Sequence, residues 1–282
     1  MAIYLMVFQG YPLLQEFYFS FTETSLLKPR DHLFVGLDNY TYLFSDPQFL
    51  GALWITLIYT IGCVIFSIGF GLGTALLLNH PFRGRGLARA LVTVPWAAPS
   101  VAVALIFTWM FNAQYGIFSH LQMALGFKDS GSQYWLDSQT LALPAVLITT
   151  IWQIFPFSSV VILAALQGVS AEVREAAIID GADRFSIFKA VTWPVIRPTV
   201  ALVALFTTIW SLRRFDTIWI LTQGGPLGAT NTLVTDLYRE AFVNRRLGSA
   251  AAVGMVGLVI ATCVTVVYYA LSNRGDGQKG AH

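Results

Sequence analysis

A long uncharged stretch, GALWITLIYTIGCVIFSIGFGLGTALLL at residues 51–78, decides the fold class. It holds no Asp, Glu, Lys or Arg, and it exceeds the length of about 20 apolar residues that carries a helix across a bilayer. Inside the hydrocarbon every backbone N–H and C=O needs a partner from the protein, and a helix supplies all of these partners itself. The stretch therefore predicts a membrane-spanning helix.

Further apolar stretches recur along the chain. The expected spans are residues 1–21, 51–78, 90–111, 141–166, 199–221 and 249–271. The fifth carries Arg213, Arg214 and Asp216 near its end, and the first is interrupted by polar residues and a proline. We expect about six spans, with the first one short at its beginning.

The overall composition agrees with this pattern. Of the 282 residues, 56% are hydrophobic and 11% are charged, whereas soluble domains carry roughly 25% charged residues. A net charge of +2 without a basic stripe gives nothing to neutralise nucleic-acid phosphates. The composition excludes a soluble enzyme, a disordered protein and a DNA-binding protein. It predicts an all-α polytopic integral membrane protein with a single transmembrane domain over residues 1–282.

The distribution of Lys and Arg predicts the orientation, because these residues favour the cytoplasmic loops. The N-terminus, residues 79–89, residues 167–198 and the tail after 271 hold more of them than the loops between. Both termini are therefore expected in the cytoplasm.

The loop between the fourth and fifth spans is the most informative segment. Ser170 can cap a helix, Glu172 stands in its first turn, and Gly181 can end it. A second short amphipathic stretch, residues 185–191, runs on to Pro194. The pattern predicts a helix-turn-helix on the cytoplasmic face.

Two occupants of this surface are possible. An amphipathic helix can rest on lipid, but anionic headgroups would repel the four carboxylates Glu172, Glu175, Asp180 and Asp183. The composition favours a protein partner.

The same loop carries a family resemblance. It contains Glu175-Ala176-Ala177, then Gly181, then Val-x-Trp-Pro ending at Pro194. This resembles the EAA loop of the permease subunits of binding-protein-dependent ABC importers, where the last motif is Ile-x-Leu-Pro. Val191 and Trp193 depart from that motif but keep apolar bulk.

The resemblance extends over nearly the whole chain and is strongest with the carbohydrate-type branch, which includes the maltose transporter. The matching segments are residues 11–12, 20–22, 35–40, 165–167, 178–182 and 215–226. At the N-terminus the family usually has about one more half-span. The resemblance implies the type I ABC importer permease fold and a place in the bacterial cytoplasmic (inner) membrane.

The resemblance also implies a coupling mechanism. The loop would dock as a coupling helix on a cytoplasmic ATPase through Glu175, Ala176, Ala177, Asp180, Gly181 and Pro194. The chain has no Gly-x-x-x-x-Gly-Lys-Ser/Thr phosphate loop, so ATP and Mg would be bound by the partner ATPase subunits and this chain needs no cofactor or metal. The expected partners are two ATPase subunits, a second permease and an extracellular or periplasmic substrate-binding protein.

Polar residues inside spans are candidates for the substrate pathway, because such groups usually face a cavity or a partner. Trp210, Arg213 and Asp216 (or Thr217) recur at three-residue spacing and are therefore expected on one helix face. Gln153, beside Trp152 and near Pro156, is a further candidate. Aromatic rings with planar polar groups suit a sugar. The arginines could instead face an anionic substrate such as glycerol phosphate, or they could pair at the end of the span and snorkel.

Packing features complete the prediction. Gly69 and Gly73 have the four-residue spacing that lets helices approach closely. Prolines 95, 99, 144 and 156 predict broken or kinked third and fourth spans. Cys63 and Cys263 are expected as unpaired core residues.

A self-contained secondary transporter remains the alternative, although no inverted repeat supports it, and no catalytic constellation supports an enzyme.

Overall fold

The computed structural model describes residue 4, residues 6–126 and residues 134–276, and these residues are mostly helical. The chain divides into two compact units, each described by itself. Unit 1 comprises Met1–Tyr59, Ala104–Val146 and Leu212–Cys263. Unit 2 comprises Thr60–Val103, Leu147–Ser211 and Val264–His282.

Four helices of the described residues are long and apolar enough to cross a membrane. They are α4 (Pro47–Asn79), α8 (Ala142–Gln167), the continuous helix Arg184–Leu212, and Leu247–Ala270 within α14 (Leu247–Asp276). The pair α5 (Arg85–Ala97) and α6 (Ser100–Met110) passes the same test together and brings the number to five. The expected spans at residues 51–78, 90–111, 141–166 and 249–271 thus correspond to described helices.

The third expected span is broken where its prolines predict. Pro95 lies inside α5, Pro99 lies between the two helices, and the helices meet at 94°. Proline has no N–H to continue the helical ladder and its ring clashes with the preceding turn, which accounts for the break. Pro156, by contrast, lies within an uninterrupted α8.

The first expected span, residues 1–21, is the clearest difference. Its described part forms a five-residue π-helix, Met6–Gly10, and the nine-residue α2 (Tyr11–Phe19). Together these are shorter than the length of about 20 residues that a span requires. Residues 1–3 and 5 of the expected span lie outside the described residues.

The fifth expected span, residues 199–221, also differs. The helical segments α10 (Arg184–Ile187), a π-helix (Phe188–Thr192) and α11 (Trp193–Leu212) run as one helix that ends at Leu212. A new helix, α12 (Asp216–Thr222), begins four residues later. The span therefore starts earlier and ends earlier than its hydropathy predicts, since the charged residues 213–216 interrupt the helix.

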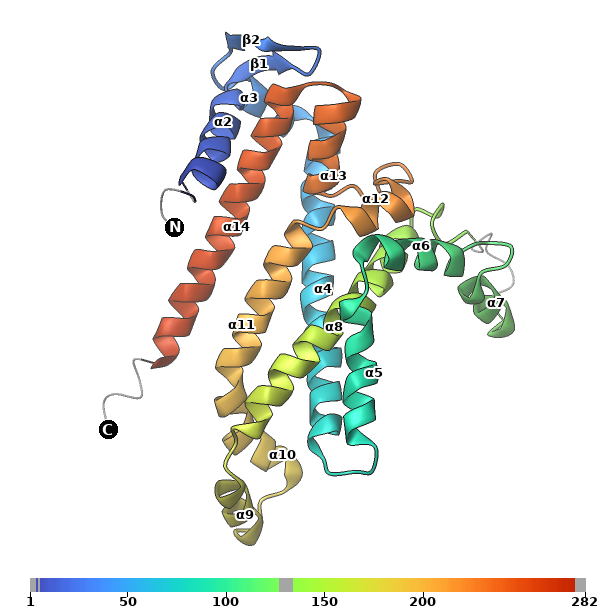
Figure 1. Cartoon of the computed structure of the whole chain (residues 1–282), viewed down its shortest axis with the longest axis vertical. Helices are drawn as coiled ribbons and strands as arrows, with labels where there is room; N and C mark the ends of the chain where they lie inside the picture. Colours follow the sequence, from blue (N-terminus) through green and yellow to red (C-terminus); the bar gives the residue numbers. More distant parts are fainter. Residues whose placement is uncertain (1–3, 5, 127–133, 277–282) are drawn as a thin grey trace. The chain divides into compact units, whose positions relative to one another are not determined.

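Unit 1 contains structure that the sequence pattern did not predict. Strands β1 (Thr22–Ser25) and β2 (Lys28–Phe34) form an antiparallel hairpin in which Thr22 pairs with Phe34, and a bulge follows Glu23. The hairpin lies over the beginning of α14 (Figure 1), where Ser25 makes an isolated bridge to Arg246. The expected spans 1–21 and 51–78 leave residues 22–50 as a connecting loop, so the hairpin was not predicted.

The core of unit 1 joins short helices to long ones. The short helices are α3 (Asp38–Ser45), α7 (Ile117–Ala124), α12 and α13 (Leu233–Tyr238), and a π-helix, Arg239–Val243, follows α13. Leu43 of α3, Phe49 of α4, Leu233 of α13 and Val253 of α14 form one buried apolar cluster. This cluster fixes α3 and α13 against the two long helices.

Unit 1 also contains polar side-chain interactions, some of them beside the hairpin. Arg246 pairs with Glu240 at 3.0 Å, donates to the Tyr42 hydroxyl at 2.9 Å, and lies over the Tyr42 ring. Asn231 donates to buried Asp236 at 2.9 Å. Burial raises the pKa of Asp236, and the Asn231 hydrogen bond opposes that rise.

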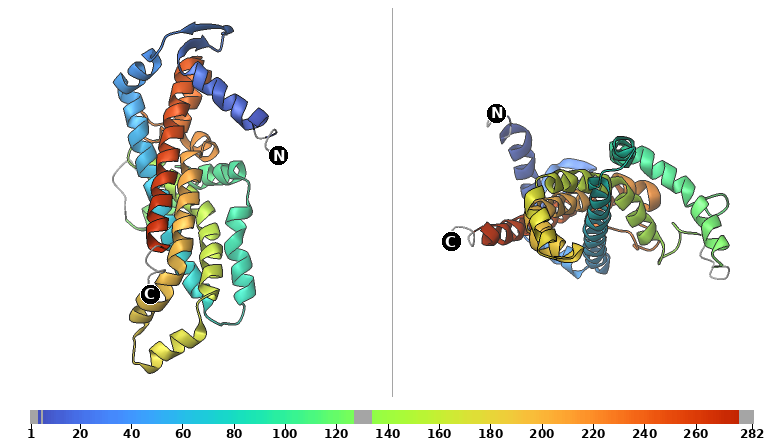
Figure 2. Two further views of the ribbon diagram at one scale, coloured as in Figure 1. Left: turned by 90° about the vertical axis from the view of Figure 1, so that its left-hand side faces the viewer. Right: turned by 90° about the horizontal axis from the view of Figure 1, so that it is seen from below.

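In unit 2 the second half of α4 packs with α5, α8 and α11 (Figures 1 and 2). Its buried cluster includes Ala75 of α4, Ile162 of α8 and Ile196 of α11. The tightest approach is at Gly71, where an added Cβ would lie 2.6 Å from the Ser158 Cβ. Gly69 and Gly73 have nothing within 4 Å of an added Cβ, so the prediction that this pair makes the close approach is wrong.

Candidate functional site

The loop that links α8 to the next long helix folds as the predicted helix-turn-helix. Its first helix is α9 (Ala171–Ile179), and the Ser170 hydroxyl accepts a hydrogen bond from the Val173 N–H at 3.4 Å. Gly181 ends it with a φ of +82°, a left-handed conformation that costs glycine little. The Ala182 N–H then donates to the Ala177 carbonyl at 3.0 Å, as in a Schellman cap. Both predicted ends of this helix are confirmed.

The second helix, α10, begins at a cap of its own. The Asp183 carboxylate accepts from the Ser186 N–H at 3.1 Å. Hydrogen bonds from the Ser186 side chain and backbone hold the pKa of Asp183 below its ordinary value. The helix continues into α11, so Pro194 stands in the first turn of α11 rather than in a linker.

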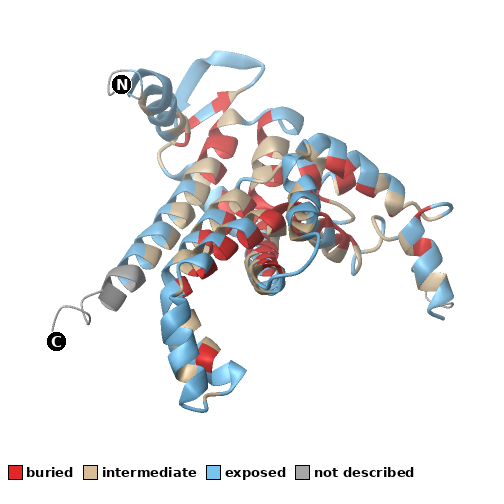
Figure 3. Cartoon of the chain, turned by 60° about the horizontal axis from the view of Figure 1, so that its bottom comes forward, coloured by how far each residue is buried: buried red, intermediate tan, exposed pale blue. Residues whose placement is uncertain are grey.

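The residues of α9 divide between two faces. Glu172, Glu175 and Ile179 recur at three- and four-residue intervals, which places them on one face, and all three are exposed. Figure 3 colours the helices at this end of unit 2 mostly as exposed. Ala176 and Asp180 are exposed and Ala177 is half-buried. The predicted coupling residues of α9 thus stand on an open helix surface that bears both apolar and acidic side chains.

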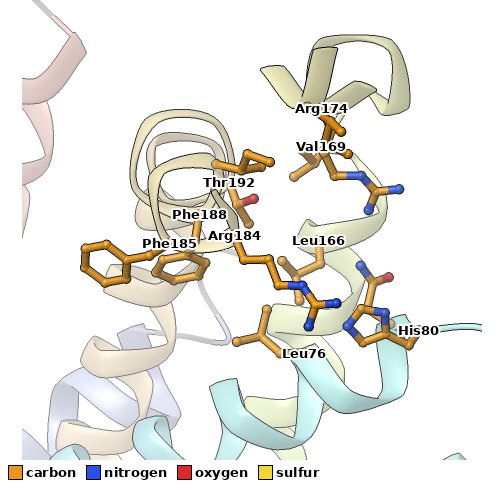
Figure 4. A pocket seen from close by; sticks show the side chains of 12 residues that line it. Leu76, His80, Leu166, Val169, Arg174, Arg184, Phe185, Phe188 and Thr192 are labelled. Carbon is orange, nitrogen blue, oxygen red and sulfur yellow. The ribbon is translucent and has the colours of Figure 1, made fainter. Parts of the chain in front are cut away.

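A second side of α9 lines a cavity of about 660 Å³ within unit 2. Arg174 and Ile178 reach it from α9, and Arg184 and Phe185 reach it from α10 (Figure 4). The ends of α4 and α8 contribute Leu76, His80 and Leu166. The sequence pattern did not single out this cavity, although the four-residue spacing of Arg174 and Ile178 could have indicated a shared face.

Gln153 is buried inside unit 2, with 6% of its surface exposed. Its side-chain amide donates to the Ala98 carbonyl at 3.0 Å. Ala98 lies in the break between α5 and α6, where the helical ladder leaves carbonyls without their usual partners. Gln153 therefore stabilises the broken span.

Trp210 belongs to an aromatic cluster of unit 2. Its ring meets Phe157 edge-on at 4.8 Å, and Phe157 meets Trp96 at 5.6 Å. Phe206 lies 6.1 Å from Trp210 on the same helix. Trp210 itself is half-buried, so part of the indole is accessible beside α11.

Arg213 and Asp216 belong to unit 1 and do not share a helix with Trp210. Arg213 is exposed in the break after α11, and Asp216 is the exposed first residue of α12. The expected single face through Trp210, Arg213 and Asp216 is therefore wrong. Arg214 donates to the Thr217 hydroxyl at 3.2 Å, which ties the break to the start of α12.

The chain matches a known family over most of its length. The family model of binding-protein-dependent transport system inner membrane components matches residues 65–275. This range contains α9 and its caps, both helices of the broken span, and the break after α11.

Curated relatives agree with this match. The sulfoquinovosyl glycerol transport system permease protein SmoG of Agrobacterium fabrum is 34% identical over 275 residues, which are 98% of this chain and 88% of that protein. The trehalose/maltose transport system permease protein MalF of Thermococcus litoralis is 35% identical over 238 residues, 83% of this chain and 78% of that protein.

A solved structure shares the fold. A chain of the bacterial alginate ABC transporter, crystallised in complex with its alginate-pentasaccharide-bound periplasmic protein, superposes with a TM-score of 0.82. It is 23% identical, and the match covers 97% of this chain and 91% of that one. The described helices thus form a type I ABC importer permease fold, and the chain belongs to the family of inner membrane components of binding-protein-dependent transport systems.

Proposed function

We propose that the chain is the membrane-spanning permease subunit of an ATP-driven importer and forms half of the translocation pathway for a sugar. Membership of the family supports the transport role. The sugar is supported by two relatives, since SmoG is named for sulfoquinovosyl glycerol and MalF for trehalose and maltose. Each relative covers more than four fifths of this chain.

The proposal depends most on the open face of α9. A helix held outside the spans by two caps, with exposed Val173 and Ile179 beside Glu172 and Glu175, is suited to a protein groove of mixed character. We place this face on a cytoplasmic ATPase subunit, with Glu175, Ala176, Ala177 and Asp180 in contact. Gly181 and Pro194 set the ends of the docking segment.

Two such ATPase subunits and a second, similar permease complete the transporter in this proposal. ATP and Mg bind to the ATPase subunits, whose closure draws the two coupling helices together and switches the spans between inward-open and outward-open states. A substrate-binding protein delivers the sugar on the opposite side. The excess of Lys and Arg in residues 79–89, in residues 167–198 and in the tail after 271 supports a position of the α9 loop and of both termini in the bacterial cytoplasm.

The proposed substrate path uses polar and aromatic residues from the ends of the long helices. In unit 2, Trp210 is a candidate ring face for a sugar. In unit 1, Arg213 and Asp216 are separate candidates to donate to and accept from substrate hydroxyls. Gln153 acts on the path indirectly, because its amide holds the broken span at Ala98.

A second candidate substrate is an anionic one, such as glycerol phosphate. Arg213 favours it, because its guanidinium is exposed in the break after α11, where a charged group of a substrate could pair with it. Maltose and trehalose are neutral whereas glycerol phosphate is anionic, so binding measurements can separate these substrates.

The discriminating experiment measures binding to the substrate-binding protein that serves this permease, with maltose, trehalose and glycerol 3-phosphate as probes. Tight binding of a neutral sugar supports the proposal, and tight binding of glycerol 3-phosphate alone replaces it with the anionic candidate. Uptake by the reconstituted transporter follows for the sugar that binds. We expect Arg213→Gln to reduce uptake of an anionic substrate more than that of a neutral sugar, with exposed Arg245→Gln as the matched control.

A further inference from the structure

The cavity behind α9 has a composition that the docking role of α9 does not explain. Its walls are mostly apolar, from Leu76, Leu166, Ile178, Phe185 and other side chains. Its polar members include Arg174, Arg184 and His80, and its described lining contains no Asp or Glu. The four carboxylates of this loop are not among the residues that line the cavity.

Both arginine side chains line the same cavity, and both residues are also exposed to solvent. Arg174 enters it from α9, and Arg184 extends across it from α10 above Leu76 toward the His80 ring (Figure 4). Among the described residues, no acceptor hydrogen-bonds to either guanidinium, and the described ion pair of the chain is elsewhere, between Arg246 and Glu240. Two cations that share an apolar cavity without a counterion attract an anionic group.

The cavity also lies at a particular depth. Leu76 and Leu166 belong to the last turns of α4 and α8, both of which are long and apolar enough to span the bilayer. The apolar wall is thus at the edge of the hydrocarbon, and the arginines come from segments just beyond it. Basic pockets between transmembrane helices at this level bind the head groups of anionic lipids.

The geometry points to a binding site for an anionic phospholipid of the leaflet that meets this end of the spans. The phosphate group pairs with Arg174 and Arg184, and the upper acyl chain lies along Leu76, Leu166 and Phe185. A phospholipid fits both the basic and the apolar parts of the cavity lining, whereas a free anion would contact only the arginines. An acidic side chain of an ATPase subunit is the competing occupant.

Such a lipid would connect four elements. It would link α9 and α10, which carry the arginines, to the ends of α4 and α8. Arg174 and Ile178 do not share the Glu172–Glu175–Ile179 face of α9, so the lipid and the ATPase subunit contact different side chains of this helix. The lipid would then stiffen the connection between the docking helix and the spans, a role beyond the proposed transport function and independent of the substrate.

The test is native mass spectrometry of the full-length chain, purified in detergent and then given dioleoylphosphatidylglycerol or dioleoylphosphatidylcholine. We expect preferential retention of phosphatidylglycerol, and we expect Arg174→Gln with Arg184→Gln to weaken that retention by about tenfold or more, because charge-assisted hydrogen bonds are lost. Arg83→Gln with Arg197→Gln removes the same charge from two exposed arginines outside the cavity and should leave retention unchanged.

A double variant that preserves both positive charges controls for misfolding. Arg174→Lys with Arg184→Lys should retain the lipid, and each variant is compared at equal monodispersity on size exclusion. Equal retention of the two lipids, undiminished retention by the double glutamine variant, or equal loss in the control pair would overturn the site. Release of phosphatidylglycerol by excess inorganic phosphate would reassign it to a free anion. Absence of lipid together with crosslinking of Arg174→Cys to an ATPase subunit would reassign it to that partner.

Discussion

At the scale of single residues, Gln153 is a polar side chain within a span that stabilises the fold through a hydrogen bond. Its amide N–H reaches the Ala98 carbonyl, which lies beside Pro99 in a break that proline makes unavoidable. A buried carbonyl without a partner costs about 1–3 kcal/mol. The residue that sequence reasoning placed on the substrate path thus also maintains the broken span that α5 and α6 form.

We predict that Gln153→Leu, which keeps the bulk but removes the donor, lowers the stability of the folded chain by about 1–3 kcal/mol. Thermal unfolding in detergent, followed by intrinsic fluorescence, measures the effect. Gln167→Leu is the matched control, since Gln167 is exposed at the end of α8. Equal unfolding midpoints for the two variants would contradict the assigned role of Gln153.

Asp183 is a second residue with a structural role, because its carboxylate stabilises the start of α10 in a pH-dependent way. Because the folded-state pKa of this carboxyl is lower than its ordinary value, its ionised form stabilises the start of α10. That contribution is present above the ordinary Asp pKa and is lost as the pH falls through the lowered folded-state value.

We predict faster amide exchange across Arg184–Ile187 in Asp183→Ala than in the wild-type chain at neutral pH, because the Ser186 N–H loses its acceptor. Asp183→Asn keeps a capping oxygen and should remain close to the wild type. Exchange that is unchanged in the alanine variant would show that the cap does not hold this helix.

At the scale of elements, the contact between α4 and α8 shows that the spacing of small residues does not by itself identify which of them lies between the two helices. The sequence favours Gly69 and Gly73 as the close contact, yet the helix turns Gly71 toward Ser158. Residues two apart on a helix face different directions. Sequence spacing predicted that glycine allows close packing in this stretch, but the face in contact is set by the neighbouring helix.

We predict that Gly71→Ala destabilises the fold by about 1–3 kcal/mol, because its Cβ would meet the Ser158 Cβ and the Ser159 backbone N–H at distances that force α8 to move. Gly69→Ala, in open space on the same helix, should be neutral or stabilising, since alanine favours helix more than glycine does. Thermal unfolding of both variants checks the difference, and a larger loss in Gly69→Ala would reverse the assignment.

The elements that sequence predicted best are those with strong local signals. α8 matches residues 141–166 within one residue at each end, and α9 begins and ends at its predicted cap and glycine. The hairpin β1–β2 was missed because its stability comes from distant partners, such as the Leu26 N–H donating to the Arg245 carbonyl. Local patterns do not report such long-range pairing.

The candidate sites also divide into features that local sequence patterns predict and features that depend on residues far apart in the chain. The open face of α9 was predictable from a motif with its spacing, whereas the cavity behind it required the ends of α4 and α8 to be brought beside Arg174 and Arg184. The break after Leu212 was missed for another reason. Hydropathy averages over residues 199–221 and does not register that Arg213, Arg214 and Asp216 interrupt the helix.

At the scale of the whole molecule, long apolar helices bury little charge, and the few charged residues gather where the chain leaves the membrane. In α9, exposed acidic, apolar and small residues combine on one face. If this face transmits nucleotide-driven motion to the spans, a single change there should uncouple transport without altering the fold.

The most direct measurement is ATP-driven sugar uptake by proteoliposomes that contain the complete transporter with wild-type chain, Glu175→Ala or Glu23→Ala. We predict that wild-type uptake requires ATP and that Glu175→Ala lowers it about tenfold, a loss within the usual range of coupling free energies of 1–3 kcal/mol. Glu23→Ala, which removes the same charge from an exposed position of β1 outside the docking segment, should retain most of the uptake. Uptake by this chain without ATP, or wild-type uptake in Glu175→Ala, would contradict the account.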